Sequence, residues 1–201
     1  MARASDTCSI DPNRSTIGFG VRQFLGVTKG KFNQFTGTIE IDREHLERSS
    51  VEARIQVKSI DTGIRKRDEH LCSAEFFNVE KFPQIIFKSL SVKQTGPQAA
   101  DVSGELTMHG ITRPLTLHVT LSTPLSEDKA MQRSRWTVTT APIRRREFAL
   151  MFSRSAEAIS GIGQEVSVEM TIEATASSTI TKSNPRELNA FAKYQSNVGS
   201  K

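Results

Sequence analysis

Cationic side chains stand in two short runs of this sequence, and such runs can bind phosphate or carboxylate groups. The runs are Arg65–Arg67 and Arg144–Arg146. A guanidinium group is planar and presents a fork of donors that matches both kinds of anion. Each run is therefore either a solvated edge or a place where one arginine, such as Arg145, turns toward an anionic head group.

Gln23 is a polar residue at a position that favours an apolar one. It follows Ile17, Phe19 and Val21 at the two-residue spacing of one strand face. A polar group on a dry face needs a hydrogen-bonding partner. Gln23 therefore either satisfies backbone groups at a strand end or contacts the polar end of a ligand.

The residue types that build catalytic and metal sites are not arranged for that purpose. The four histidines have no metal-ligand spacing, and two cysteines are too few for a disulfide framework or a zinc cluster. We expect Cys8 and Cys72 to be free thiols. The glycine-rich phosphate loops and the GxSxG elbow are also missing. We therefore expect no catalytic residue, no metal and no cofactor; an enzyme would need Asp68 or His70 to face the interior.

Strict alternation of apolar and polar residues indicates strands with one dry face. The pattern is complete over 51–58, 115–122 and 166–173. One dry and one wet face is typical of antiparallel sheets. With five further segments the count reaches about eight, which favours an all-β barrel or sandwich. The further segments are Thr16–Phe24, Lys29–Asp42, Gln84–Thr95, Ala99–His109 and Arg133–Pro142.

One connection between predicted strands is helical rather than extended. Arg65–Ser73 lacks a strand pattern and contains good helix formers. The chain that follows is rich in phenylalanine. We expect Phe76, Phe77 and Phe82 to cap one end of the barrel or to line its wall.

Length and charge narrow the classes of function. The 201 residues carry a net charge of +5. Four basic residues against one acidic residue fall in 177–201, so much of the excess lies in a tail and a binder of nucleic acid or of an acidic surface is disfavoured. We assign residues 1–176 to a barrel domain and 177–201 to a polar basic tail, disordered or folded as a short docked helix.

The sequence also bears on location. No apolar run approaches the roughly 20 residues that cross a bilayer. The first residues lack the apolar core of a secretory signal. We therefore expect no membrane span and a cytoplasmic protein, or a periplasmic one if a signal was removed.

Six blocks of sequence, in order from about Ile10 to Ala176, form a recognisable pattern. They are Ile10–Phe19, Gly30–Gly37, Arg67–Leu71 with Glu75–Pro83, Phe87–Ser89, Gly104–Pro114, and the late Arg145, Phe148 and Leu150. In these blocks the chain resembles the YceI-like family, whose members bind polyisoprenoids. The tail lies outside the resemblance.

The resemblance implies an extended, eight-stranded antiparallel barrel of the lipocalin-like kind, with a short helical crossover and a long apolar cavity. It implies a ligand such as a polyisoprenoid, an isoprenoid quinone or a fatty-acid-like lipid, and a homodimer fits the family. We predict a lipid carrier or sequestering protein without catalysis; an enzyme acting on a lipid or quinone inside the barrel is the alternative. The predicted ligand-binding residues are Phe19, Val21, Gln23, Phe32, Phe35, Phe77, Phe87, Leu106, Met108, Arg145, Phe148 and Leu150.

This sequence departs from the family pattern at several positions. Cys8 replaces a Trp, Arg14 and Gln23 replace His, and Ala149 replaces a Gly. The fold carries over, but the identity of the ligand does not, because the changes at Arg14 and Gln23 alter the groups available to a lipid head. At Ala149 we expect the added methyl group to fill part of the cavity.

Overall fold

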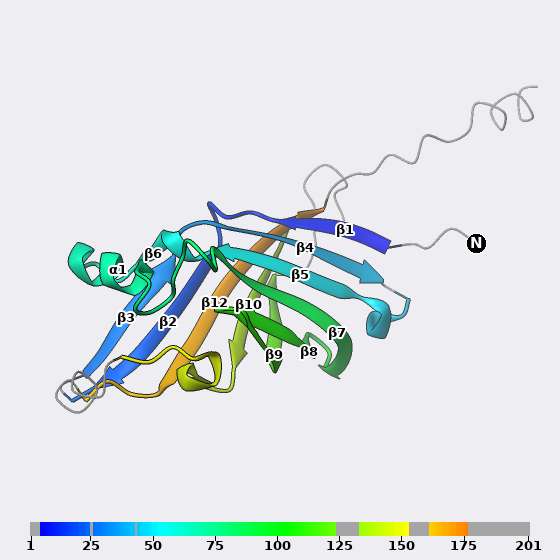
Figure 1. Ribbon diagram of the computed structural model, residues 1–201. Coiled ribbons are helices and arrows are strands. Elements are labelled where there is room, and N and C mark those ends of the chain that lie inside the picture. Colours follow the sequence, from blue (N-terminus) through cyan, green and yellow to red (C-terminus); the bar gives the residue numbers. More distant parts are fainter. Residues whose placement is uncertain (1–4, 25, 43, 124–132, 153–160, 177–201) are drawn as a thin grey trace, which may run out of the picture.

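Antiparallel strands form most of the described chain, and they close into one barrel (Figure 1). The computed structural model describes residues 5–24, 26–42, 44–123, 133–152 and 161–176. The barrel closes because β12 pairs with β1 as well as with β10. The eight strands of the closed ring are β1 (Ser5–Ile10), β4 (Phe35–Asp42), β5 (Ser50–Gln56), β7 (Gln84–Gly96), β8 (Ala99–Met108), β9 (Ile111–Thr123), β10 (Arg133–Thr140) and β12 (Glu165–Ala176). The predicted all-β antiparallel barrel is confirmed.

Strand β12 changes its partner along its length, and this extends the sheet beyond the closed ring. The end of β12 pairs with β1, whereas its first half pairs with β2 (Thr16–Gln23). β2 then pairs with β3 (Gly26–Phe32), and β3 pairs with β6 (Ile60–Asp61). A short β11 (Ile143–Arg144) pairs with the start of β12. The β2–β3 hairpin therefore projects from one end of the barrel (Figure 1).

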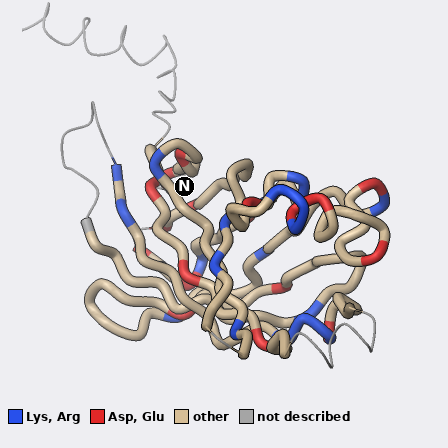
Figure 2. Tube along the Cα trace, turned by 90° about the vertical axis from the view of Figure 1, so that its left-hand side faces the viewer, with Lys and Arg blue, Asp and Glu red and all other residues tan. Residues whose placement is uncertain are grey.

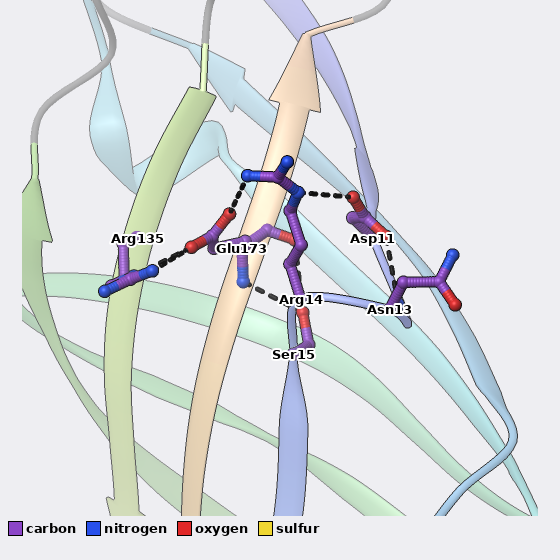
Figure 3. Close-up of polar contacts among 6 residues, drawn as sticks. All are labelled: Asp11, Asn13, Arg14, Ser15, Arg135 and Glu173. Atoms are coloured by element: carbon purple, nitrogen blue, oxygen red, sulfur yellow. Dashed lines mark hydrogen bonds and ion pairs between the residues drawn. The ribbon is translucent and has the colours of Figure 1, made fainter.

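A buried carboxylate lies at the point where β12 changes partner (Figure 3). The backbone N–H of Glu173 donates to Ser15 Oγ at 2.9 Å. The side chain of Glu173 accepts a hydrogen bond from Arg135 Nε at 2.9 Å and lies 3.9 Å from Arg14 Nη1. Arg14 Nε also lies 3.7 Å from Asp11. A buried charge is tolerated only when it is paired, and here two guanidinium groups pair it, Arg14 from the β1–β2 connection and Arg135 from β10.

Two strand boundaries differ from the prediction. Ser5–Ile10 forms β1, which the sequence did not predict, because Ile10 is its one large apolar residue. The predicted strand Lys29–Asp42 is broken between Phe32 and Phe35. Both phenylalanines are buried although they are three residues apart. An unbroken strand would place them on opposite faces, so the chain bends at the two residues between them.

The predicted helical crossover is confirmed as α1 (Arg65–Cys72), which lies at the end of the barrel where the β2–β3 hairpin projects (Figure 1). The part of the chain that the structure describes also contains three short 3-10 helices: η1 (Leu46–Arg48), η2 (Val57–Ser59) and η3 (Arg145–Phe148). Among the described residues, no helix is both long and apolar enough to cross a bilayer. Strand β12 ends at Ala176, and the predicted tail 177–201 lies outside the described residues.

Candidate functional site

A cavity of about 760 Å³ runs through the interior of the barrel. Its walls are the dry faces of the strands, and every second residue of β9 and β12 contributes to them. The lining residues of these two strands are Leu115, Leu117, Val119 and Leu121, and Val166, Val168, Met170 and Ile172. The alternation seen in the sequence therefore describes the wall of a cavity rather than a fully packed core. Eight-stranded barrels of this kind have room for one slender ligand.

Nearly all of the predicted ligand-binding residues contribute to this wall. They come from strands β2, β3, β4, β7 and β8, from the segment after α1, and from the η3 region. The predicted residues that line the cavity are Phe19, Val21, Gln23, Phe32, Phe35, Phe77, Phe87, Leu106, Met108, Arg145 and Leu150. Their contact with a ligand stays a prediction.

Phe148 is the exception, although it belongs to the same buried apolar core as Leu106 and Leu150. Its side chain is buried, but it is not part of the cavity wall. The backbone carbonyl of Phe148 lies 3.1 Å from His109 Nδ1, beside the turn between β8 and β9. Of this segment, Arg145 at the start of η3 and Leu150 just after it line the cavity.

The expectation that Ala149 fills part of the cavity is wrong. Ala149 is exposed and caps the end of η3 in the left-handed region, with φ 56°. Glycine adopts this conformation without a steric penalty, whereas a residue with a Cβ does not. The replacement of glycine by Ala149 therefore strains the backbone and leaves the cavity unchanged.

The crossover closes the α1 end of the cavity with aromatic rings. Phe76 and Phe77 are buried, line the cavity and meet edge to face, with ring centroids 5.1 Å apart. Phe152 stacks on Phe76 at 4.5 Å and on His70 at 5.9 Å. Phe82 does not belong to this group, because its ring packs against His109 outside the cavity. The predicted wall is therefore confirmed for Phe76 and Phe77 but not for Phe82.

Arg145 is buried at this end of the cavity, and its guanidinium group is held by backbone carbonyls. Nε donates to the carbonyl of Gly163 at 3.0 Å, and Nη1 donates to the carbonyl of Leu150 at 2.8 Å. The guanidinium carbon lies 5.4 Å from the centre of the Phe152 ring. The contact with Gly163 joins η3 to the segment that precedes β12. These contacts are a structural use of the arginine that the sequence did not indicate.

The residues that would make this cavity an active site are only partly in place. His70 lines the cavity, and its Nδ1 lies 3.6 Å from Glu75, but its side chain is about half exposed. Asp68 is outside the cavity wall and accepts hydrogen bonds from the backbone N–H and the hydroxyl of Thr62. Arg67 lines the cavity and donates to the same threonine. The hydrogen bonds that Asp68 and Arg67 make with Thr62 thus hold α1 in position.

Two further groups near α1 have shifted acidities. Burial raises the pKa of the Cys72 thiol, and the nearby Asp68 carboxylate adds to the shift. Hydrogen bonds from the Gly63 backbone N–H and from Asn33 lower the pKa of Asp61. Both Cys72 and Cys8 are free cysteines, as predicted. The surroundings of Cys72 therefore do not activate its thiol as a nucleophile.

The two arginine runs do not form one basic surface. One run begins α1 and the other spans β11 and η3, and Arg145 of the second run is buried. In the view onto the α1 end, basic segments are interspersed with acidic ones (Figure 2). A continuous acidic polymer would need an uninterrupted basic stripe.

The sequence did not single out Trp136, although it lines the cavity. It is the only tryptophan of the chain, and its ring N–H donates to Ser134 Oγ at 2.8 Å. The alternation of apolar and polar residues could have identified it, because Trp136 and Val138 alternate with polar residues in a predicted strand. The fluorescence of the Trp136 indole therefore reports on the cavity.

The family of the chain follows from comparison of its sequence with known families. Residues 9–174 match the model of the YceI-like domain. The chain belongs to the YceI-like family. Protein YceI of Salmonella arizonae and that of Salmonella newport are each 45% identical to it over 92 residues. The match covers 46% of this chain and 48% of either relative, so it spans about half the length of the curated YceI proteins.

Solved structures share the barrel. Burkholderia cenocepacia BcnA superposes with a TM-score of 0.71 at 23% identity, over 83% of this chain and 99% of BcnA. Campylobacter jejuni YceI gives 0.65 at 20% identity, over 74% of this chain and 84% of its own. A polyisoprenoid binding domain from Saccharophagus degradans gives 0.64 at 17% identity, over 88% of this chain and all of that domain. At these identities the likeness concerns the fold.

Proposed function

We propose that this YceI-like protein binds one long-chain apolar lipid in its barrel cavity and carries or sequesters it without catalysis. The lipid is a polyisoprenoid, an isoprenoid quinone or a similar chain. The observation that carries the proposal is the cavity itself, about 760 Å³ of space lined mostly by aliphatic and aromatic side chains. A volume of this size is within the range of ligand pockets.

The apolar wall favours a lipid chain without polar groups along its length. Apolar strand faces offer no hydrogen bonds, so binding free energy comes from burial, at about 0.8 kcal/mol per buried methylene group. The wall is mostly apolar; Arg67, His70 and Arg145 line it toward the α1 end, and Gln94 and Gln98 line it at the β7–β8 turn. The remaining wall suits the tail of a lipid, with its head at one end of the cavity.

Family membership supports the same proposal. The Saccharophagus degradans domain that shares the fold is described as polyisoprenoid binding. A non-catalytic role is supported by the hydrogen bonds of two arginines in the cavity wall. Arg67 donates to Thr62, and Arg145 donates to backbone carbonyls. A cytoplasmic location and a homodimer stay predictions.

Titration of the fluorescence of Trp136 with a long-chain isoprenoid quinone tests the proposal. A quinone in the cavity lies beside the indole and quenches it, so we expect saturable quenching at one lipid per chain. Ala53→Phe places a ring in the cavity from β5 and should lower the affinity; Arg54→Phe is the matched control, because Arg54 is exposed on the opposite face of β5. No saturable quenching, or equal losses in both variants, would contradict binding in the cavity.

A further inference from the structure

The β2–β3 hairpin exposes apolar side chains on its outer face. Phe24 is 76% exposed and Val27 is 54% exposed, although both are large hydrophobic residues. Val27 packs beside Gly20 on the outer face, and the ring of Phe24 lies against the backbone of Gly161. Exposed apolar groups that gather at one tip indicate a contact surface rather than scattered surface residues.

Cationic side chains flank these apolar groups on the same hairpin. Arg22 and Lys29 are exposed, and Arg22 pairs directly with Val27 in the register of the two strands. Lys31 is also exposed but lies farther from the tip, beside the acidic Asp61 of β6. The end of the hairpin thus combines exposed apolar groups with positive charge, which complements a surface that is both apolar and anionic.

The inner face of the same hairpin belongs to the cavity. Phe19, Val21 and Gln23 of β2 and Thr28 of β3 line it. The hairpin projects at the α1 end of the barrel (Figure 1). It therefore has the cavity on one side and the exposed apolar groups on the other, so a surface that binds its tip is brought next to the cavity.

We infer that the tip of the β2–β3 hairpin, formed by Arg22, Phe24, Val27 and Lys29, docks on the surface of an anionic lipid bilayer. The inference extends the proposed function, because a lipid with a long apolar chain resides in bilayers and has to be taken from one or delivered to one. Phe24 and Val27 enter the boundary between head groups and acyl chains, while Arg22 and Lys29 contact anionic head groups.

Co-sedimentation of the full chain with vesicles tests the docking surface. We expect binding to vesicles of phosphatidylcholine with phosphatidylglycerol, and weaker binding to phosphatidylcholine alone. Phe24→Ser should lower the partition coefficient about tenfold on both. Lys29→Gln should lower it about fivefold, or about 1 kcal/mol, on the anionic vesicles only. Leu90→Ser and Lys93→Gln are the matched controls, because both residues are exposed on β7, and should bind as the unaltered chain does.

Three results would overturn the inference. The first is no binding of the unaltered chain to anionic vesicles, and the second is an equal loss of binding in the hairpin and β7 variants. The third is an association of two copies that depends on Phe24, without any binding to vesicles. The last is read by sedimentation velocity without vesicles. Lipid occupancy of the cavity is measured separately by mass spectrometry on the same samples. A chain that holds lipid in its cavity but does not bind vesicles refutes the docking inference alone. A chain that binds vesicles but takes up no lipid in its cavity refutes the proposed function alone.

Discussion

Replacement of Arg145 distinguishes a structural arginine from one that binds a lipid head group. Arg145→Ala removes the donors to the carbonyls of Gly163 and Leu150. A hydrogen bond from a charged donor contributes about 1.5–3 kcal/mol. Leu150 is buried and its carbonyl loses a partner that water does not easily replace, whereas the carbonyl of Gly163 is less buried. We therefore expect a loss of about 3–4 kcal/mol in the free energy of unfolding, in the lower part of the range that two such hydrogen bonds would give.

Urea denaturation measures this loss, with Arg144→Ala as the matched control. Arg144 is exposed, so its removal should change the free energy of unfolding by less than about 0.5 kcal/mol. Arg145→Lys should recover part of the loss, because one ammonium group does not reproduce the fork of a guanidinium. Affinities for a prenyl phosphate and for the matching prenol should fall together or stay unchanged. An unfolding free energy equal to that of Arg144→Ala, with a loss confined to the prenyl phosphate, would refute this reasoning and assign Arg145 to the head group.

The remaining predictions concern the crossover, the η3 cap and a cysteine. Phe77→Ala should cost about 3 kcal/mol in urea denaturation, at the low end for a buried Phe, because its ring already borders open space; a negligible change would show that the crossover does not support the barrel. Ala149→Gly should raise the free energy of unfolding by about 1 kcal/mol by relieving the left-handed strain, and a destabilised variant would contradict it. Cys72 should react with iodoacetamide at neutral pH more slowly than a free thiol, because a raised pKa leaves less thiolate; the Cys72→Ser variant shows how much labelling Cys72 accounts for, and fast labelling would contradict the raised pKa.

The sequence predicted the parts of the fold that repeat with period two. Alternation along β9 and β12 identified the residues that now line the cavity, since each dry strand face becomes part of the barrel wall. It did not predict β1, because Ser5–Ile10 is mostly polar and is held in the sheet by pairing with β4 and β12. Such pairing depends on distant segments and leaves little local signal.

The site was less predictable where the backbone stops alternating. Phe148 and Leu150 are two residues apart, which in a strand would place both on one face. In the structure the 3-10 turn and the left-handed Ala149 separate them, and only Leu150 reaches the cavity. The same turn buries Arg145 and gives it backbone carbonyls as partners, an arrangement that residue type and spacing do not reveal.

Native mass spectrometry of the protein purified from its own host tests the central claim most directly. We expect a population of the folded chain that is heavier than the sequence mass by one long-chain apolar lipid, which is released on denaturation and identified by its own mass. We also expect a chain stripped of lipid to take up one isoprenoid molecule when isoprenoid lipid is added. A folded chain found only at its sequence mass, and still at that mass after incubation with isoprenoid lipids, would contradict the proposal that the barrel holds a lipid.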